Sequence, residues 1–188
     1  MTGLASAGQN RMSFLRVALF TVPALVLIGS LSGQLSNSGY SNAWFAALEK
    51  PSFMPPGWAF GAAWTILYIL LGLSLAMLIH ARGAHWRRPA LVLFLVQLAV
   101  NFAWSPVFFA FHQTEAALVM ILVMLGLSVA AAVLAWWIRP AASLLMIPYL
   151  GWLCFAAALT TEIIRLNPNA SALVSPAASA DIPINNSY

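Results

Sequence analysis

The sequence predicts an all-α fold, an integral membrane bundle of five transmembrane helices. Of the 188 residues, 62% are hydrophobic and only 6% are charged, and the mean hydropathy is +0.89. A soluble domain has about a quarter charged residues, because polar side chains must cover the surface that faces water. This chain has too few of them for such a surface, so its natural solvent is the lipid bilayer.

Long apolar runs locate the helices. Each run has about 19 to 24 residues, and at roughly 1.5 Å per residue this covers a hydrocarbon core of about 30 Å. Backbone N–H and C=O groups must be paired internally at that depth, so such runs predict helices, because barrel strands would be about half as long and would alternate. The runs are Val17–Leu35, Trp58–Ile79, Pro89–Phe111, Ala116–Ile138 and Ala141–Ile164.

The first run has some features of a signal peptide, since Arg11 and Arg16 precede it. It is longer than the usual apolar region of such a peptide, and the sequence SLSGQL near its end is a poor cleavage site. We therefore expect a retained first helix. We divide the chain into an N-terminal tail (1–14), a membrane domain (15–169) and a disordered C-terminal tail (170–188).

Lys and Arg residues predict the orientation of a multi-pass protein. Five spans place the N-terminus and the connectors after the second and fourth helices on one side, where six cationic residues lie, against Lys50 and Arg165 on the other. In a bacterial cell membrane this makes the N-terminus cytoplasmic, and an outer membrane stays as the alternative. The pI of 9.9 reflects this asymmetry and indicates no nucleic-acid partner. The six residues are Arg11, Arg16, Arg82, Arg87, Arg88 and Arg139.

Polar side chains within the spans are few and therefore informative. In the third span, a set of residues at offsets of four, seven, eight and eleven from Gln97 shares one helical face. Two carboxamides on this face are costly against lipid, so they should face the bundle interior or a cavity; hydrogen bonding to neighbouring helices alone is the alternative. Pro106 frees the carbonyl of Phe102 and favours a kink. The shared face comprises Gln97, Asn101, Trp104, Ser105 and Phe108.

Aromatic residues inside two other spans predict a ligand cavity. Trp64 and Tyr68 share a face of the second span, and Tyr149, Trp152 and Ala156 lie along a face of the fifth. Aromatic rings beside carboxamides suit a flat, largely apolar ligand with a few polar edges. Other tryptophans lie near span ends, where an interfacial belt is the ordinary interpretation; they are Trp58, Trp86, Trp136 and Trp137.

Catalytic and metal-binding patterns are absent from the sequence. No span contains an acid–base pair, a histidine cluster or a Ser/His/Asp set, and a buried charge relay for ion-coupled transport is missing. We therefore predict no catalytic residues, no metal and no required cofactor. Glu162 should pair with Arg165, the histidines should be solvated, with axial haem ligation as the alternative, and Cys154 should be a small core residue.

The connector between the first two spans, Glu49–Trp64, contains three prolines and two tryptophans and is not a plain polar loop. Pro55 and Pro56 suit the first turn of a helix, and Pro51 biases Lys50 toward an extended conformation. These residues predict a stiff cap that ends where the second helix begins.

Three ordered motifs resemble the TspO/MBR family, also called translocator protein or tryptophan-rich sensory protein. The first runs from Trp44 to Tyr68 and includes the KPSFMPP sequence, the second is QLAVNFAWSPVFF in the third span, and the third is PYLGWLCFAAALTTEIIRLN in the fifth. The resemblance covers residues 15–169. In animal members tyrosines precede a final arginine of helix five, where this chain has Thr161 and Glu162, which favours a bacterial member.

The resemblance implies a structured loop between helices 1 and 2 that covers a ligand cavity, and a homodimer. It implies porphyrins, haem and related tetrapyrroles, and drugs of the benzodiazepine site, as ligands. The implied lid residues are Trp44, Lys50, Pro51, Pro55 and Pro56. The expected ligand-binding residues are Trp64, Tyr68, Gln97, Asn101, Trp104, Phe108, Tyr149, Trp152 and Ala156.

The leading functional prediction is a membrane receptor or sensor that binds tetrapyrroles and has a regulatory or stress-response role. One alternative is a light- or oxygen-dependent porphyrin-degrading enzyme, in which Trp64 and Trp152 would carry the chemistry. A second alternative is a transporter of porphyrin or other hydrophobic solutes, which the lack of an inverted repeat makes less favoured.

Overall fold

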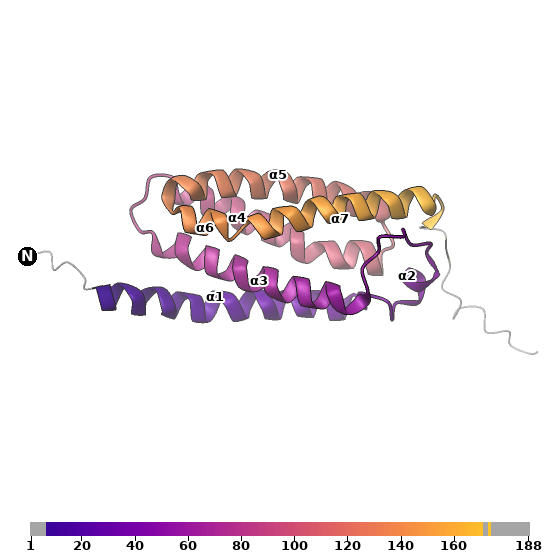
Figure 1. The fold of residues 1–188 in the computed structure, drawn as a ribbon, viewed down its shortest axis with the longest axis horizontal. Helices are drawn as coiled ribbons and strands as arrows, with labels where there is room; N and C mark the ends of the chain where they lie inside the picture. The colour runs from indigo at the N-terminus through magenta and orange to yellow at the C-terminus, as the bar shows by residue number, and fades with distance from the viewer. Residues whose placement is uncertain (1–6, 171–172, 174–188) are drawn as a thin grey trace, which may run out of the picture.

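The computed structural model describes residues 7–170 and residue 173, and in this part of the chain every regular element is helical (Figure 1). Five stretches are long and apolar enough to cross a membrane. The predicted all-α fold with five spans is therefore confirmed. The elements are α1 (Ala7–Leu35), α2 (Ala43–Ala47), α3 (Gly57–His80), α4 (Arg87–Ser105), the π-helix η1 (Pro106–Ala110), α5 (Thr114–Ile138), α6 (Pro140–Leu144) and α7 (Ile147–Leu166).

The first helix is longer than the apolar run that predicted it. It begins at Ala7 and passes through Arg11 and Arg16, which are both exposed. The charged ends of such arginine side chains reach water while their methylene groups cover apolar surface. The N-terminal part of this helix therefore extends beyond the hydrocarbon core. The predicted disordered C-terminal tail comprises residues 170–188. Of these, Ala170 is buried and accepts a hydrogen bond from Trp44, whereas residues 171–172 and 174–188 lie outside the described residues.

The fifth span contains a break that the apolar run did not reveal. It consists of the short α6 and the longer α7, with a turn at Leu145 and Met146 between them. Pro148 lies in the first turn of α7 and has no N–H to donate to the carbonyl of Leu144. The helix therefore ends before this proline and begins again, because the first turn is where proline costs least.

The helices run side by side along the long axis of the molecule, and the α2 segment lies at one end (Figure 1). Helix α1 packs on α3, and α5 packs on both α4 and α7. Gly72 allows the close approach of α1 and α3, because a Cβ atom there would lie 2.7 Å from the Cα of Val22. The Thr21 hydroxyl donates a hydrogen bond of 2.8 Å to the Gly72 carbonyl and strengthens this contact.

Large apolar side chains cover much of the outer surface of the bundle, as lipid contact requires. The tryptophans predicted for the interfacial belt, Trp58, Trp86, Trp136 and Trp137, are all exposed. The prediction that Cys154 is a core residue is wrong, because its side chain is exposed. It follows Leu153 by one residue, and a step of about 100° around the helix turns it from the core toward the outside.

Candidate functional site

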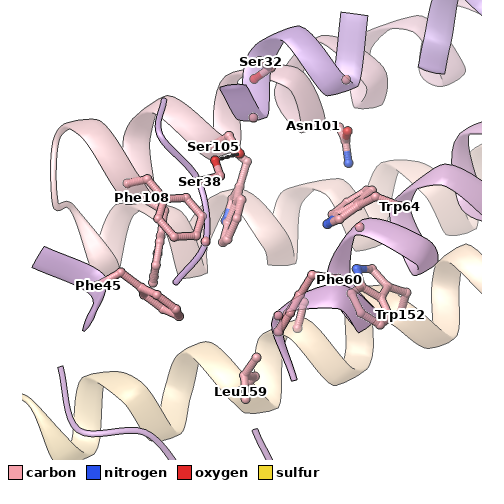
Figure 2. A pocket seen from close by; sticks show the side chains of 18 of the residues that line it. Ser32, Ser38, Phe45, Phe60, Trp64, Asn101, Ser105, Phe108, Trp152 and Leu159 are labelled. Atoms are coloured by element: carbon pink, nitrogen blue, oxygen red, sulfur yellow. Dashed lines mark hydrogen bonds between the residues drawn. The ribbon is translucent and has the colours of Figure 1, made fainter. Parts of the chain in front are cut away.

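A cavity of about 690 Å³ lies near the end of the bundle where the α1–α3 loop is. Residues of α1, the loop, α3, α4, η1, α5 and α7 line it, and a close view shows side chains converging from several of these elements (Figure 2). Small-molecule sites have volumes of about 300–1,000 Å³ and are mostly apolar. The size and lining of this cavity match that class of site.

One wall of the cavity is aromatic and comes from α3 and α7. The Trp64 and Tyr68 rings stack with centroids 5.3 Å apart, because residues four apart lie on one helical face. Trp152 meets Trp64 edge to face at 6.1 Å, and Phe60 meets Trp152 in the same manner at 5.9 Å. These rings offer both faces and edges to a planar ligand.

A second aromatic group comes from α4, η1 and the loop. Trp104 and Phe108 are nearly parallel, with centroids 5.0 Å apart, and Phe108 also contacts Phe45 of α2 at 6.1 Å. Figure 2 places Phe45 and Phe108 across the cavity from the group around Trp64. The Trp104 indole donates to the carbonyl of Ala117 at 3.0 Å, which fixes its ring orientation. The cavity is thus bounded on two sides by rings.

A chain of hydrogen bonds leads from the cavity into the core. The Tyr68 hydroxyl donates to Asn101 Oδ1 at 2.8 Å, and Asn101 Nδ2 donates to the Tyr149 hydroxyl at 3.1 Å. Tyr149 in turn donates to Gln97 Oε1 at 2.8 Å, and the Ser128 hydroxyl donates to the same oxygen at 3.4 Å. Such pairing offsets the cost of placing polar groups at membrane depth.

The predicted ligand-binding residues divide into two groups. Gln97 and Tyr149 are fully buried and lie behind the cavity, where they orient Asn101 and need not touch a ligand. Gln97 therefore only forms hydrogen bonds to neighbouring helices, which was the alternative to facing a cavity. Asn101 does both, because it bonds to its neighbours and lines the cavity. The predicted residues that line the cavity are Trp64, Tyr68, Asn101, Trp104, Phe108, Trp152 and Ala156.

Pro106 changes α4 more than a simple kink would. The α-helix ends at Ser105 and continues as the π-helix η1, which carries Phe108 into the cavity wall. The Ser32 hydroxyl of α1 donates to the Phe102 carbonyl, which Pro106 leaves without its helical donor. A second contact of 2.9 Å joins the hydroxyls of Ser38 and Ser105 (Figure 2). Pairing with α1 thus satisfies the backbone that the proline disrupts.

Sequence reasoning missed the contribution of α1 and of the loop tip to the cavity. Ser32, Ser38, Tyr40 and Phe45 line it, but no helical periodicity distinguishes them from other residues of an apolar span or loop. Several lining residues of α1 and α3 are also exposed, so the cavity reaches the protein surface between these two helices. They are Ser30, Gln34, Gly61 and Thr65.

The predicted lid residues support the loop and do not line the cavity. Trp44 is almost fully buried, stacks on His112 at 4.3 Å and donates its indole N–H to the Ala170 carbonyl at 2.7 Å. His112 is thus packed against an aromatic ring and is only partly solvated. The cavity-lining part of the loop instead includes Phe45 and Met54. Lys50, Pro51, Pro55 and Pro56, like Trp44, are absent from the lining.

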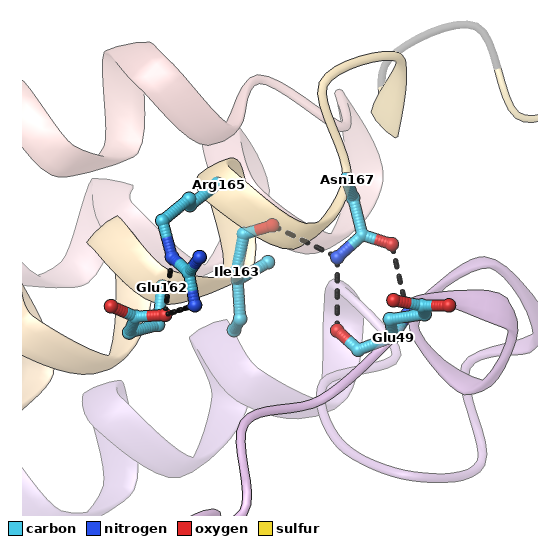
Figure 3. Close-up of polar contacts among 5 residues, drawn as sticks. All are labelled: Glu49, Glu162, Ile163, Arg165 and Asn167. Carbon is cyan, nitrogen blue, oxygen red and sulfur yellow. Dashed lines mark hydrogen bonds and ion pairs between the residues drawn. The ribbon is translucent and has the colours of Figure 1, made fainter.

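Hydrogen bonds fasten the loop to the end of α7 (Figure 3). The Glu49 backbone N–H donates to Asn167 Oδ1 at 2.8 Å, and Asn167 Nδ2 donates to the Glu49 carbonyl at 2.9 Å. Asn167 Nδ2 also donates to the Ile163 carbonyl at 2.8 Å, which holds the carboxamide in place. The predicted pair of Glu162 and Arg165 is confirmed, with a separation of 2.8 Å.

Comparison with known proteins identifies the family of this chain. A sequence model of the TspO/MBR family matches residues 20–166, which include all five spans in whole or in large part. The chain belongs to the TspO/MBR family. The resemblance inferred from the motifs is thereby confirmed. Together with the five apolar helices, this membership makes the chain a multi-pass integral membrane protein.

Relatives of this TspO/MBR member occur in archaea, bacteria and animals. "Tryptophan-rich protein TspO" of Archaeoglobus fulgidus is 38% identical over 148 residues, which are 78% of this chain and 94% of that protein. "Tryptophan-rich sensory protein" of Cereibacter sphaeroides is 39% identical, over 67% of this chain and 78% of that protein. "Translocator protein" of Sus scrofa is 38% identical, over 75% of this chain and 86% of that protein.

Proposed function

We propose that this protein is a membrane sensor that binds porphyrins and related tetrapyrroles in the aromatic cavity. The observation that carries the proposal is a cavity of about 690 Å³ with aromatic groups on two sides. A planar conjugated ring gains favourable stacking and edge contacts from such walls in addition to burial of its apolar surface. The sensory role is supported by a relative named for it, from Cereibacter sphaeroides.

The polar groups of the cavity fit the edge of such a ligand. Asn101 has its carboxamide oriented by Tyr68 and Tyr149, so the position of its polar atoms is set before a ligand arrives. Serine hydroxyls at positions 32, 38 and 105 lie at another part of the lining. A mostly apolar cavity with a few placed polar groups binds by burial and selects by hydrogen bonding.

Titration with protoporphyrin IX tests the proposal. Trp64→Phe and Trp152→Phe should each weaken binding by roughly twofold to tenfold, since an aromatic pair contributes about 0.5–1.5 kcal/mol beyond its buried area. Quenching of tryptophan fluorescence and the porphyrin absorbance report the affinity. Trp137→Phe is the matched control, because Trp137 is 74% exposed and does not line the cavity. Unchanged affinity in both cavity variants would refute the assignment of the site.

A further inference from the structure

The cavity lining is uncharged. Its residues all belong to the described part of the chain, and they include serines, threonines, carboxamides, aromatic and aliphatic side chains, but no Asp, Glu, Lys, Arg or His. An ionised group buried without a countercharge is strongly unfavourable. A ligand with an acidic substituent must therefore place that substituent at a cation near the cavity wall or leave it in water.

Lys50 is a cation beside two rings of that wall, although it is not itself a lining residue. Its Nζ atom lies 5.0 Å from the ring centroid of Phe45 and 5.8 Å from that of Tyr40, and both rings line the cavity. The ammonium group donates to the carbonyls of Ala46 at 3.1 Å and Leu48 at 3.0 Å. An ammonium has three N–H donors, so one donor remains for a further acceptor.

Within residues 7–170, no carboxylate forms an ion pair with this ammonium group. In the part of the chain that the structure describes, the only ion pair joins Arg165 and Glu162. Glu49 is the next residue to Lys50, but its side chain is exposed and makes no ion pair with Lys50. Partial burial accordingly lowers the pKa of Lys50 through desolvation. A ligand carboxylate would offset that desolvation cost.

We propose that Lys50 forms an anion subsite at the loop side of the cavity, which takes a carboxylate of a planar ligand whose ring occupies the aromatic cavity. The inference rests on the proposed function and makes it more specific, since it names an acidic planar ring as the preferred ligand class. The loop position of Lys50 suits this role. Four rotatable bonds connect its ammonium group to the Cα atom, so the group can adjust its position. The uncharged lining offers a ligand carboxylate no competing cation.

Comparing a diacid with its ester tests the subsite. Protoporphyrin IX and its dimethyl ester share the ring and differ in the carboxylates, so each is titrated into the full chain in uncharged detergent, where no lipid phosphate competes. Lys50→Met should weaken binding of the diacid by roughly tenfold, as expected when a charge-assisted hydrogen bond is lost. Binding of the ester should stay unchanged, and Lys50→Arg should retain the preference for the diacid.

Controls separate the subsite from other effects of the substitution. Arg88→Met removes an exposed cation elsewhere in the chain and should leave both affinities unchanged. Equal weakening of diacid and ester in Lys50→Met would mean that Lys50 only holds the loop, and no weakening of either would mean that no subsite exists. Both results overturn the subsite but leave the proposed function standing. Failure of the unsubstituted chain to bind either compound overturns the proposed function together with the subsite.

Discussion

At the scale of single residues, Tyr68 joins the aromatic wall of the cavity to its polar group. Its hydroxyl bonds to Asn101, its ring stacks on Trp64, and both partners line the cavity. Gly29 of α1 makes room for this ring. A Cβ atom at Gly29 would lie 2.1 Å from Cε2 of Tyr68, which is far inside van der Waals contact.

Gly29→Ala should therefore move the Tyr68 ring and weaken its bond to Asn101. We expect a loss of stability of about 1–3 kcal/mol, because the displaced ring gives up its hydrogen bond to Asn101 and its stacking on Trp64. Unfolding in mixed micelles measures this loss. Gly126→Ala is the matched control, because a Cβ atom there would meet nothing within 4 Å. Equal stabilities of the two variants would contradict the close approach of α1 to Tyr68.

At the scale of elements, the loop that contains α2 is fastened to the end of α7. The contacts come from residues 118 positions apart in the sequence, Glu49 and Asn167, and from the Trp44 indole and the Ala170 carbonyl. Around them, Trp44, Phe45 and Leu48 are buried with Phe108 and Ile163 in an apolar cluster. The loop is thus part of the packed structure, and it places Phe45 in the cavity wall.

Asn167→Ala should loosen the loop without unfolding the bundle. The Glu49 amide loses its acceptor, so its hydrogen exchange should accelerate by roughly fivefold to tenfold, since one hydrogen bond contributes about 1 kcal/mol. The Phe45 amide is an internal reference, because it donates to the Asn42 side chain. Asn169→Ala, at an exposed position, serves as the control. Unchanged exchange at Glu49 would show that the apolar contacts alone hold the loop.

At the scale of the whole molecule, the cationic residues are concentrated at one end of the bundle. The N-terminal part of α1, the α3–α4 connector and the α5–α6 junction lie at the end opposite to α2 (Figure 1). These segments contain Arg11, Arg16, Arg82, Arg87, Arg88 and Arg139, whereas Lys50 and Arg165 lie toward the α2 end. We propose that the arginine-rich end is cytoplasmic in a bacterial cell membrane.

Fusion reporters measure this orientation. Alkaline phosphatase is active only outside the cytoplasm, so a fusion within the α1–α3 loop, after Ser52, should be active and a fusion after Ala84 should be inactive. Replacing Arg82, Arg87 and Arg88 by Gln should reduce the difference, because it removes half of the cations on the predicted cytoplasmic side. The opposite pattern of activity would reverse the proposed orientation.

The structure brings many of the predicted site residues together at one cavity, and it places others elsewhere for physical reasons. Trp64, Asn101 and Trp152 line the cavity, as expected for polar and aromatic groups that avoid lipid inside a span. Tyr149 satisfies the same rule by bonding to Gln97 behind the cavity, so the rule cannot separate a lining residue from a supporting one. The loop prolines predicted a structured connector, but their positions do not identify which loop side chains face inward.

The sequence by itself determined that the chain is a helical membrane protein with five spans, and it located the aromatic motifs. These properties depend on the length and composition of each segment, because lipid requires an apolar run to pair its own backbone groups. Only the tertiary structure decided which residues line the cavity, how Pro106 is accommodated by α1, and how Asn167 fastens the loop to α7. These properties depend on how each helix is rotated about its axis and on contacts between residues far apart in the chain, which local patterns do not specify.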